Sequence, residues 1–433
     1  MDETGKPPRV VGKFGATLMS INGMIGAGIF ALPALLYSTV GNFAPWLFLI
    51  FGVLFGCGTL VAARFAMMFR SSGAAQLWTQ VAFGPLVGFL VGWLLILAMA
   101  AGRAATLYVL VSYLAVIFPA MGDPAMRALT LAVLLAALTA ITTSGMSKSV
   151  GGLAVGTALK LAPIVLLCMF AFARGGIATH FELPQLGEVG SVALLVYFAY
   201  SGVGTATNSA GELKNPRRDL PVTMLGSLAA ITLFYMLVQW AYIAAGAPQG
   251  SGDKTPLAAA AGAVMGNWGS LLLSVAAIFS IATNSLNFFI AAPRVIYGMA
   301  DRGLLPATLT HVSTRFASPD RAIALFAVLV AAMLGSGAFT FLAEVNSLAG
   351  TLISVVCVLA FIVLMHRAEN GHDGHMAWYW WVVLAIFSAF CFYIIAQAQL
   401  SAYLLLLVLL VLGYGLYYIA RRDEVIAPEP EFD

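Results

Sequence analysis

The sequence predicts an all-α integral membrane protein with twelve transmembrane helices. Of its 433 residues, 61% are hydrophobic and 9% are charged, whereas a soluble domain carries about 25% charged residues. Long apolar runs recur along the whole chain, and lysine and arginine gather in alternate connections between these runs. The net charge of +3 is too small for a nucleic-acid-binding face. Soluble enzymes, nucleic-acid-binding modules and disordered scaffolds are therefore excluded, and the protein acts within a lipid bilayer.

Twelve apolar runs reach the length of about 20 residues that a helix needs to cross a bilayer. We expect the first five helices at about 14–40, 44–69, 84–118, 125–143 and 150–173. The next five are expected at about 191–211, 219–246, 265–299, 321–338 and 344–366, and the last two at about 377–396 and 401–420. The first run is too long for the apolar part of a signal peptide, so we expect it to remain as a membrane helix.

The distribution of positive charge predicts the orientation of these helices. With the N-terminus inside, the outer connections hold only Arg127, Arg174 and Lys254. The cytoplasmic segments then hold fifteen cations, namely Lys6, Arg9, Lys13, Arg70, Lys148, Lys214, Arg217, Arg218, Arg294, Arg302, Arg315, Arg321, Arg367, Arg421 and Arg422. This bias is the positive-inside pattern. We therefore expect a multi-pass protein of a bacterial-type cytoplasmic (inner) membrane with both termini in the cytoplasm.

Two cations fall near the middle of predicted membrane helices. Arg64 lies at the inner end of its helix and reaches the interface, but Arg103 and Lys160 lie near midplane depth. A charge at the midplane costs from a few to more than ten kcal/mol and is by default a functional hypothesis. Every Asp and Glu falls in a connection, a tail or near a helix end. This absence argues against a metal ion or a polyamine held by midplane carboxylates.

No cofactor or metal site is predicted from the cysteines and histidines. Each of the four cysteines stands alone in an apolar run, and we interpret them as small hydrophobic residues buried in the protein: Cys57, Cys168, Cys357 and Cys391. His372 and His375 suggest a metal site only weakly, because no further ligand is near them, and a solvated polar loop is the favoured interpretation.

Glycine clusters interrupt two of the predicted helices at similar depth. The helix at 14–40 contains Asn22-Gly-Met-Ile-Gly-Ala-Gly28, and the helix at 191–211 contains Tyr200-Ser-Gly-Val-Gly-Thr205. Each glycine costs a helix about 1 kcal/mol, and irregular backbone persists in a membrane only where it is buried or lines a polar cavity. Close helix packing is the alternative role of such glycines. Matching interruptions in two successive sets of five helices, however, indicate a transporter site between inverted repeats.

The two interruptions also predict what such a site binds. A half-helix that begins near Ala27-Gly28-Ile29 presents free N–H groups and a positive dipole end to an anion. In the helix expected at 191–211, the half before the glycine cluster ends near Phe198-Ala-Tyr200. Its last carbonyl groups are left free to accept hydrogen bonds from an ammonium group. A cavity between these ends suits a zwitterionic α-amino acid.

Three longer motifs resemble those of the amino acid–polyamine–organocation transporters, and they follow in order along essentially the whole chain. They are Gly26-Ala-Gly-Ile-Phe-Ala-Leu-Pro33, then Tyr197-Phe-Ala-Tyr-Ser-Gly202 with Gly211-Glu-Leu-Lys-Asn-Pro-Arg-Arg-Asp-Leu-Pro221, and finally Arg294-Val-Ile-Tyr-Gly-Met-Ala-Asp-Arg-Gly-Leu-Leu-Pro306. The resemblance implies one transmembrane domain (1–433) with a leucine-transporter-type core of five plus five inverted helices (14–173 and 191–366). The helices within 377–420 would be peripheral, and transport would proceed by alternating access.

The resemblance also implies a set of binding residues. Gly26, Ala27 and Gly28 would take the substrate carboxylate, and Phe198 would be the aromatic gate over the site. Tyr200 and Ser201 match the interruption that receives the amino group. The remaining residues of the two binding segments are Gly23, Met24, Ile25, Ala199 and Gly202.

Lys160 resembles the lysine that many members carry in this helix, where its ammonium occupies the region of sodium in sodium-coupled relatives. The resemblance implies proton-coupled transport or sodium-independent exchange. Burial disfavours the charged form of a lysine, which then exchanges a proton near neutral pH; a fixed structural charge is the alternative. Thr283 and Asn284 are candidates beside Lys160, with interhelical hydrogen bonding as their alternative role.

The sequence departs from the family pattern at two positions. Gly204 stands where several members carry an acid that acts in proton transfer or pH sensing, which weakens the case for proton coupling. Arg103 matches no role in the family, and contact with a substrate, with a chloride-like anion or with backbone carbonyls all remain open. We place Arg103 in a possible polar core together with Asn287.

We expect a secondary transporter of a small or medium neutral L-amino acid. The absence of midplane acids and the apolar wall of Met24, Ile25 and Phe198 favour a neutral substrate. An exchanger of cationic amino acids or polyamines and a transporter-like sensor are the alternatives, while the symport or exchange mode and the oligomeric state stay open. An enzyme is not expected, because no combination of nucleophile, base and orienting group is visible.

Overall fold

The computed structural model describes residues 17, 21–68, 74–144, 150–177, 180–203, 216–247, 254–313, 316, 318–335, 338–369 and 377–420. Some residues singled out above lie outside this described part. They are Lys6, Arg9, Lys13, Arg70, Lys148, Gly204, Thr205, Lys214, Arg315, His372, His375, Arg421 and Arg422, together with residues 211–215 of the second motif.

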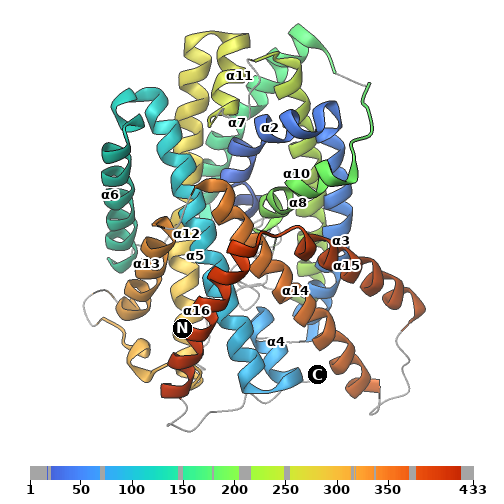
Figure 1. The fold of residues 1–433 in the computed structure, drawn as a ribbon, viewed down its shortest axis with the longest axis vertical. Helices are drawn as coiled ribbons and strands as arrows, with labels where there is room; N and C mark the ends of the chain where they lie inside the picture. Colours follow the sequence, from blue (N-terminus) through green and yellow to red (C-terminus); the bar gives the residue numbers. More distant parts are fainter. Residues whose placement is uncertain are drawn as a thin grey trace.

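The elements of the described part are α-helices and short 3-10 helices (Figure 1). The first half of the chain forms α2 (Ala27–Val40), η1 (Gly41–Phe43), α3 (Ala44–Met68), α4 (Ala74–Phe83), α5 (Pro85–Ile117), η2 (Pro119–Gly122), α6 (Pro124–Thr143), α7 (Val150–Gly175) and α8 (Leu186–Tyr200). The second half forms α10 (Pro216–Ala244), α11 (Pro256–Met265), α12 (Asn267–Asp301), η4 (Ala307–Thr310), α13 (Asp320–Leu334), α14 (Phe339–Glu369), α15 (Trp378–Ala396) and α16 (Leu400–Ala420).

Eight stretches of the described residues are long and apolar enough to cross a membrane, and the first of them runs from Ala27 to Phe65 through α2, η1 and α3. The predicted all-α membrane protein is therefore confirmed, while the number of twelve crossings stays a prediction. The helices α4 and α11 form where the sequence predicted connections. Each has 10 residues and is therefore too short to cross a bilayer. The sequence analysis considered apolar runs of about 20 residues, so it did not predict these two short helices.

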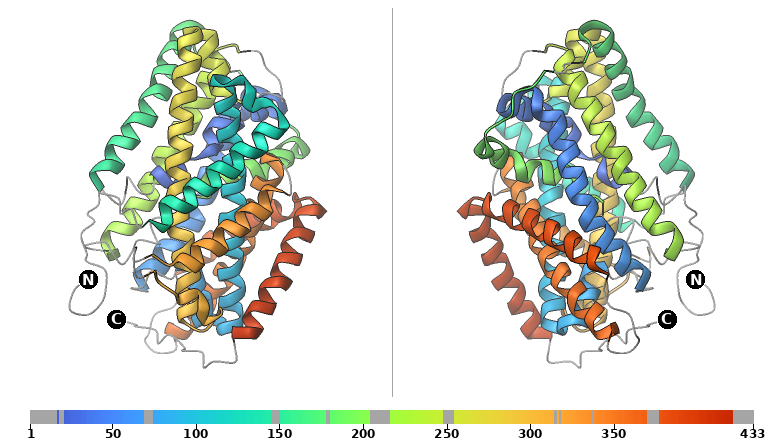
Figure 2. Two further views of the ribbon diagram at one scale, coloured as in Figure 1. Left: turned by 90° about the vertical axis from the view of Figure 1, so that its left-hand side faces the viewer. Right: turned by 90° about the vertical axis from the view of Figure 1, so that its right-hand side faces the viewer.

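Helix α5 lies in the middle of the bundle, with α6 and α13 on one side and α3 and α10 towards the other (Figure 1). It packs against α14, α12, α4 and α13. In its most apolar window 72% of the residues are buried, against 17% in α6, 28% in α15 and 22% in α16. The views in Figure 2 show α15 and α16 along one side of the molecule. A helix surrounded in this way is apolar on every face, and its polar residues must find partners inside the protein.

Local sequence sets several of the helix ends. Pro85 opens α5 after Gly84, whose φ of 93° is a conformation that glycine adopts without strain. Asp123 caps α6, because its carboxylate accepts hydrogen bonds from the N–H groups of Ala125 and Met126. Gly266, with a φ of 73°, ends α11 and starts α12. These glycines and caps let consecutive helices reverse direction within a few residues.

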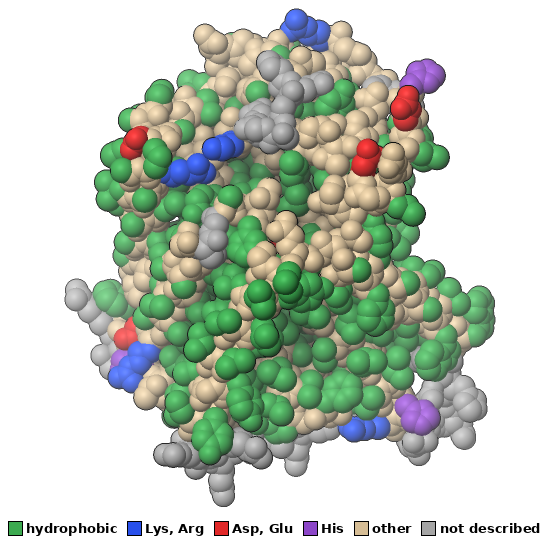
Figure 3. All heavy atoms as spheres, in the orientation of Figure 1, with side chains coloured by type: hydrophobic (Ala, Val, Ile, Leu, Met, Phe, Trp, Pro, Cys, Tyr) green, Lys and Arg blue, Asp and Glu red, His purple; other side chains and the backbone are tan. Residues whose placement is uncertain are grey.

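Charged side chains lie towards the two ends of the long axis on the face drawn in Figure 3. Between them lies a belt of hydrophobic side chains, uncharged other side chains and backbone. Such a belt suits contact with lipid tails, where an exposed charge is costly.

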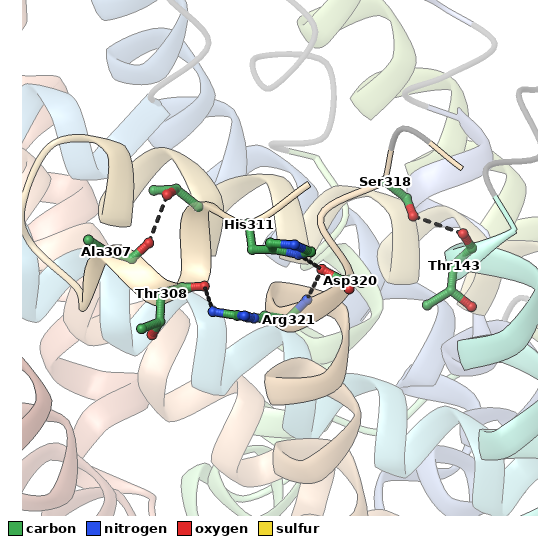
Figure 4. A network of polar contacts seen from close by, with 8 residues as sticks. Thr143, Ala307, Thr308, His311, Ser318, Asp320 and Arg321 are labelled. Carbon is green, nitrogen blue, oxygen red and sulfur yellow. Dashed lines mark hydrogen bonds and ion pairs between the residues drawn. The ribbon is translucent and has the colours of Figure 1, made fainter. Parts of the chain in front are cut away.

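A polar network joins α6, η4 and α13 (Figure 4). The Ser318 hydroxyl donates to the carbonyl of Thr143 over 2.8 Å, and Arg321 donates to the carbonyl of Thr308 over 3.2 Å. His311 Nδ1 lies 2.7 Å from Asp320 Oδ1. This contact holds the pKa of Asp320 below its usual range. The network holds Ser318 and the start of α13 against the end of α6 and against η4.

Helix α4 is held by two arginines, one on α14 and one just after the end of α12. Arg367 donates to the carbonyls of Val81 and Ala82, which lie at the end of α4 where a helix leaves its carbonyls free. Arg302 donates to the side chain of Gln76. These contacts tie α4 to α14 and to the end of α12, and α4 also packs against α5.

The packing of α16 on α5 makes a prediction for stability. A Cβ atom at Gly413 would lie 2.2 Å from Nε1 of Trp93, and this indole donates to the carbonyl of Leu409 over 2.9 Å. We expect Gly413→Ala to destabilise the protein by about 1–3 kcal/mol through overpacking, measured as a lower Tm in detergent. Gly415→Ala is the matched control, since no described atom lies within 4 Å of its added Cβ and alanine favours a helix. Equal Tm values for the two variants would contradict this packing.

Candidate substrate site

The first break lies at residues 25–26. Residues 21–24 are helical, the chain bends at Ile25 and Gly26, and α2 begins at Ala27 as the sequence predicts. The N–H of Gly26 bonds to the carbonyl of Met24 over 2.9 Å, and no described side chain caps the start of α2. The first N–H groups of an α-helix have no partners within it. This end of α2 therefore offers donors to an anion.

The second break lies at residues 201–203. Helix α8 ends at Tyr200, which also agrees with the prediction, and the next three residues form a turn. The hydroxyl and the N–H of Ser201 reach the carbonyl of Phe198 over 2.8 and 3.2 Å. The N–H of Val203 bonds to the carbonyl of Tyr200 over 3.1 Å. The Phe198 carbonyl therefore accepts two hydrogen bonds, whereas the Tyr200 carbonyl accepts one from Val203 and keeps a second lone pair for a further donor.

The two breaks touch each other through glycine. A Cβ at Gly202 would lie 2.2 Å from the carbonyl oxygen of Gly23, and one at Gly28 would lie 3.0 Å from Cα of Ala199. The hydroxyl of Tyr235 on α10 lies 2.8 Å from the carbonyl oxygen of Met24 and 3.2 Å from that of Ala199. Close backbone approach and this shared hydroxyl hold the breaks together.

Lys160 on α7 reaches the first break. Its side chain is 1% exposed, and Nζ donates to Oδ1 of Asn22. Asn22 itself is 4% exposed. Within the described part of the chain no carboxylate pairs with Lys160. The ammonium group is thus linked to the broken segment by an uncharged amide.

Arg103 on α5 reaches the same break through Asn284 on α12. Arg103 Nη1 donates to Asn284 Oδ1 over 2.5 Å, and the guanidinium lies 3.9 Å from the ring centre of Phe288. Asn284 Nδ2 in turn lies 3.0 Å from the carbonyl oxygen of Asn22 and 3.2 Å from that of Gly23. Two buried cations therefore meet the first break from different helices, each through an asparagine.

A cavity of about 240 Å³ lies beside the breaks. Arg103, Tyr200 and Ser201 line it, whereas residues 23–28 do not. The other described lining residues are Phe55, Gly58, Thr59, Val61, Ala62, Phe65, Ala75, Trp78, Leu95, Ala98, Met99, Tyr197, Val203, Met224, Phe288, Asn346, Gly350, Ile353, Ser354, Cys357 and Phe387. Arg103 and Asn284 thus connect the cavity to the first break.

The structure brings most of the predicted residues together. Lys160, Arg103 and Asn284 meet at the first break, while Phe198 is buried and packs edge-on against Phe339 at 5.7 Å. The hydroxyl of Thr283 bonds instead to carbonyls of its own helix, those of Phe279 and Ser280. Asn287 lies one turn further along α12 and is partly buried.

The sequence analysis missed three residues of this site. Asn22 and Asn346 are asparagines inside apolar helices, and this isolation was a signal that could have identified them. Tyr235 gave no such signal, because a tyrosine in an apolar run is common. Its role depends on the fold, which places it between two distant segments.

Comparison with known proteins gives a match to the family described as Amino acid permease over residues 11–419. The chain is 27% identical to the branched-chain amino acid permease BcaP of Bacillus subtilis (strain 168), over 96% of this chain and 93% of that protein. It is 26% identical to the serine/threonine exchanger SteT of the same bacterium, over 83% of this chain and 84% of that protein. It is also 26% identical to the vacuolar cationic amino acid transporter 4 of Arabidopsis thaliana, over 80% of this chain and 62% of that protein.

The contact between the breaks makes a prediction for activity. In Gly202→Ala the new Cβ would meet the backbone of Gly23, so the two breaks must separate. We expect a loss of amino acid counterflow of about 100-fold, because small displacements of a site have effects of this size. Gly226→Ala on α10 is the control, since its Cβ meets no described atom within 4 Å. Counterflow by Gly202→Ala at the rate of this control would refute the assignment.

Proposed function

We propose a specific transport function for this chain, which belongs to the amino acid permease family. The family match confirms the resemblance that the motifs indicated, and the named relatives are transporters. The proposed function is secondary active transport of a neutral L-amino acid across the cytoplasmic membrane by alternating access. The observation that carries it is the meeting of two helix breaks, one with free N–H groups and one with free carbonyl lone pairs, beside a cavity.

The architecture that goes with this function is also a proposal. We place twelve crossings in one domain, with inverted repeats at 14–173 and 191–366, two peripheral helices within 377–420, and both termini in the cytoplasm of a bacterial cell. The breaks at residues 25–26 and 201–203 support this assignment, because they fall in the first helix of each proposed repeat.

In the proposed binding mode, the substrate zwitterion lies between the breaks. Because the N–H of Gly26 already bonds to Met24, the carboxylate of the substrate accepts hydrogen bonds from the N–H groups of residues 27 and 28, where the positive end of the α2 dipole lies. Its ammonium group donates to the end of α8, where the carbonyl of Tyr200 keeps a lone pair. Residues 23–28 do not line the cavity, so this mode requires the Arg103–Asn284 contact to open towards the break.

Charge favours a neutral substrate over a cationic one. Arg103 and Lys160 are both buried near the breaks, and the described lining of the cavity contains no carboxylate. A lysine, an arginine or a polyamine would bring further positive charge to this region and be repelled. Two of the relatives are named for neutral amino acids, namely the branched-chain amino acid permease and the serine/threonine exchanger, and they support a neutral substrate. The relative named as a cationic amino acid transporter supports the alternative of a cationic substrate.

Counterflow by the purified protein in proteoliposomes tests this function. Vesicles loaded with one unlabelled amino acid would accumulate the same labelled amino acid, in a panel of neutral, cationic and acidic compounds at two pH values with and without sodium. We expect accumulation of neutral L-amino acids without a sodium requirement. Accumulation of cationic compounds alone would favour the alternative substrate class. Binding without flux would favour a sensor, and a protein that neither binds nor moves any amino acid would contradict the proposal.

Lys160 is the proposed coupling residue. We expect Lys160→Met to flatten the pH dependence of uptake, because a group that exchanges a proton during transport is removed. The measurement is initial uptake from pH 5 to 9 in proteoliposomes, with Lys160→Arg as a control that keeps the charge. An unchanged pH profile with lower activity would leave Lys160 only a structural role at Asn22.

A further inference from the structure

Asn346 on α14 presents a fixed and unused acceptor beside the cavity. Its Nδ2 donates to the carbonyl of Ala98 on α5 over 2.7 Å, and this bond identifies the other terminal atom as the oxygen. Oδ1 is buried and has no hydrogen-bond partner in the described part of the protein. The helices approach closely here, since a Cβ at Gly102 would lie 2.8 Å from Asn346 Nδ2.

Arg103, the next residue after Gly102, presents an unused donor at the same cavity. Its side chain is 6% exposed, and its one hydrogen bond to a described residue is the bond to Asn284. The Nε atom is buried without a described partner. A buried donor or acceptor that lacks a partner costs about 1–3 kcal/mol, so both atoms indicate a partner that the protein itself does not supply.

The hydroxyl groups around the cavity do not share this property. Thr59 donates to the carbonyl of Phe55, Ser201 to that of Phe198, and Ser354 to that of Gly350. Tyr200 donates to the carbonyl of Phe48 on α3. Most of the remaining lining is apolar. Among the described residues that line the cavity, Arg103 and Asn346 are thus the two that carry a buried side-chain polar atom without a hydrogen-bond partner.

We propose that Arg103 and Asn346 form a subsite for the substrate side chain, and that this subsite selects an uncharged group which both accepts and donates a hydrogen bond. The carboxamide of asparagine or glutamine and the hydroxyl of serine or threonine have this chemistry. The carbonyl or hydroxyl oxygen accepts from Arg103, and the N–H or O–H group donates to Asn346 Oδ1. The inference rests on the proposed transport of neutral amino acids and narrows it to polar members of that class.

An aliphatic side chain or a carboxylate would leave Arg103 Nε, Asn346 Oδ1 or both atoms without a hydrogen-bond partner. An aliphatic side chain offers no partner to either atom. A carboxylate accepts from Arg103 but turns oxygen towards Asn346 Oδ1, which cannot rotate into a donor without losing the bond to Ala98. The pair of atoms thus favours an uncharged polar group over both.

Near-isosteric substrate pairs test the subsite in proteoliposome counterflow. For the wild-type protein we expect threonine over valine, asparagine over leucine, and asparagine over aspartate, each by about tenfold, which corresponds to one buried hydrogen bond. In Asn346→Leu the threonine-to-valine ratio should fall to within about twofold. Arg103→Gln provides a second variant, and it should lower the same ratio. The thermal shift of each purified protein in detergent with threonine or valine gives a measurement that does not require transport.

The outcomes separate this inference from the function on which it rests. Equal rates for threonine and valine in the wild-type protein would overturn the subsite, and so would a preference for aspartate over asparagine. A uniform loss of every amino acid in a folded Asn346→Leu protein would mean that the pair holds the α-amino and α-carboxyl groups, which also overturns it. No uptake or binding of any amino acid by the wild-type protein would instead overturn the proposed function.

Discussion

The backbone of the first break is the constraint on which the core depends. In an unbroken helix the carbonyls of Asn22 and Gly23 would accept from the N–H groups of residues 26 and 27. The turn at residues 25–26 removes these partners, and the interior of a bilayer offers no water in their place. Asn284 supplies donors to both carbonyls, and the Tyr235 hydroxyl lies within hydrogen-bonding distance of the next one, at Met24. The positions of α10 and α12 are therefore coupled to an interruption in a different helix.

Amides rather than acids connect the two buried cations to this break. The side chain of an asparagine both accepts and donates, so Asn284 takes a hydrogen bond from Arg103 with its oxygen and gives one to the backbone with its nitrogen. A carboxylate at the same position could only accept, and it would cancel the positive charge. Because Asn22 and Asn284 leave the charges of Lys160 and Arg103 uncancelled, the region keeps a positive potential. The use of asparagine rather than aspartate thus provides hydrogen bonds to the broken backbone and leaves the positive charge of the site uncancelled.

Local sequence predicted the interruptions and the cations but not the contacts between them. Glycine clusters fixed the start of α2 at Ala27 and the end of α8 at Tyr200, because glycine weakens a helix wherever it stands. Burial of Arg103 and Lys160 followed from their place in apolar runs. Their partners lie 181 and 138 residues away in the chain, at distances that no helical periodicity encodes. Thr283 shows the converse, since its neighbour Asn284 points into the site while its own hydroxyl bonds within α12. The register of a helix against its neighbours decides between such adjacent residues.

The central position of α5 explains how the site and the packing of the bundle come to depend on the same helix. A helix enclosed on all sides meets a different neighbour at each successive residue. Gly102 lets α14 approach closely, and Arg103 bonds to Asn284 on α12. Tyr113 donates to the carbonyl of Phe30 on α2, and Trp93 donates to a carbonyl of α16. Each contact fixes the rotation of α5 about its axis, so the guanidinium of Arg103 is positioned by packing along the whole helix. A small rotation of α5 would carry Arg103 away from Asn284 and the first break together.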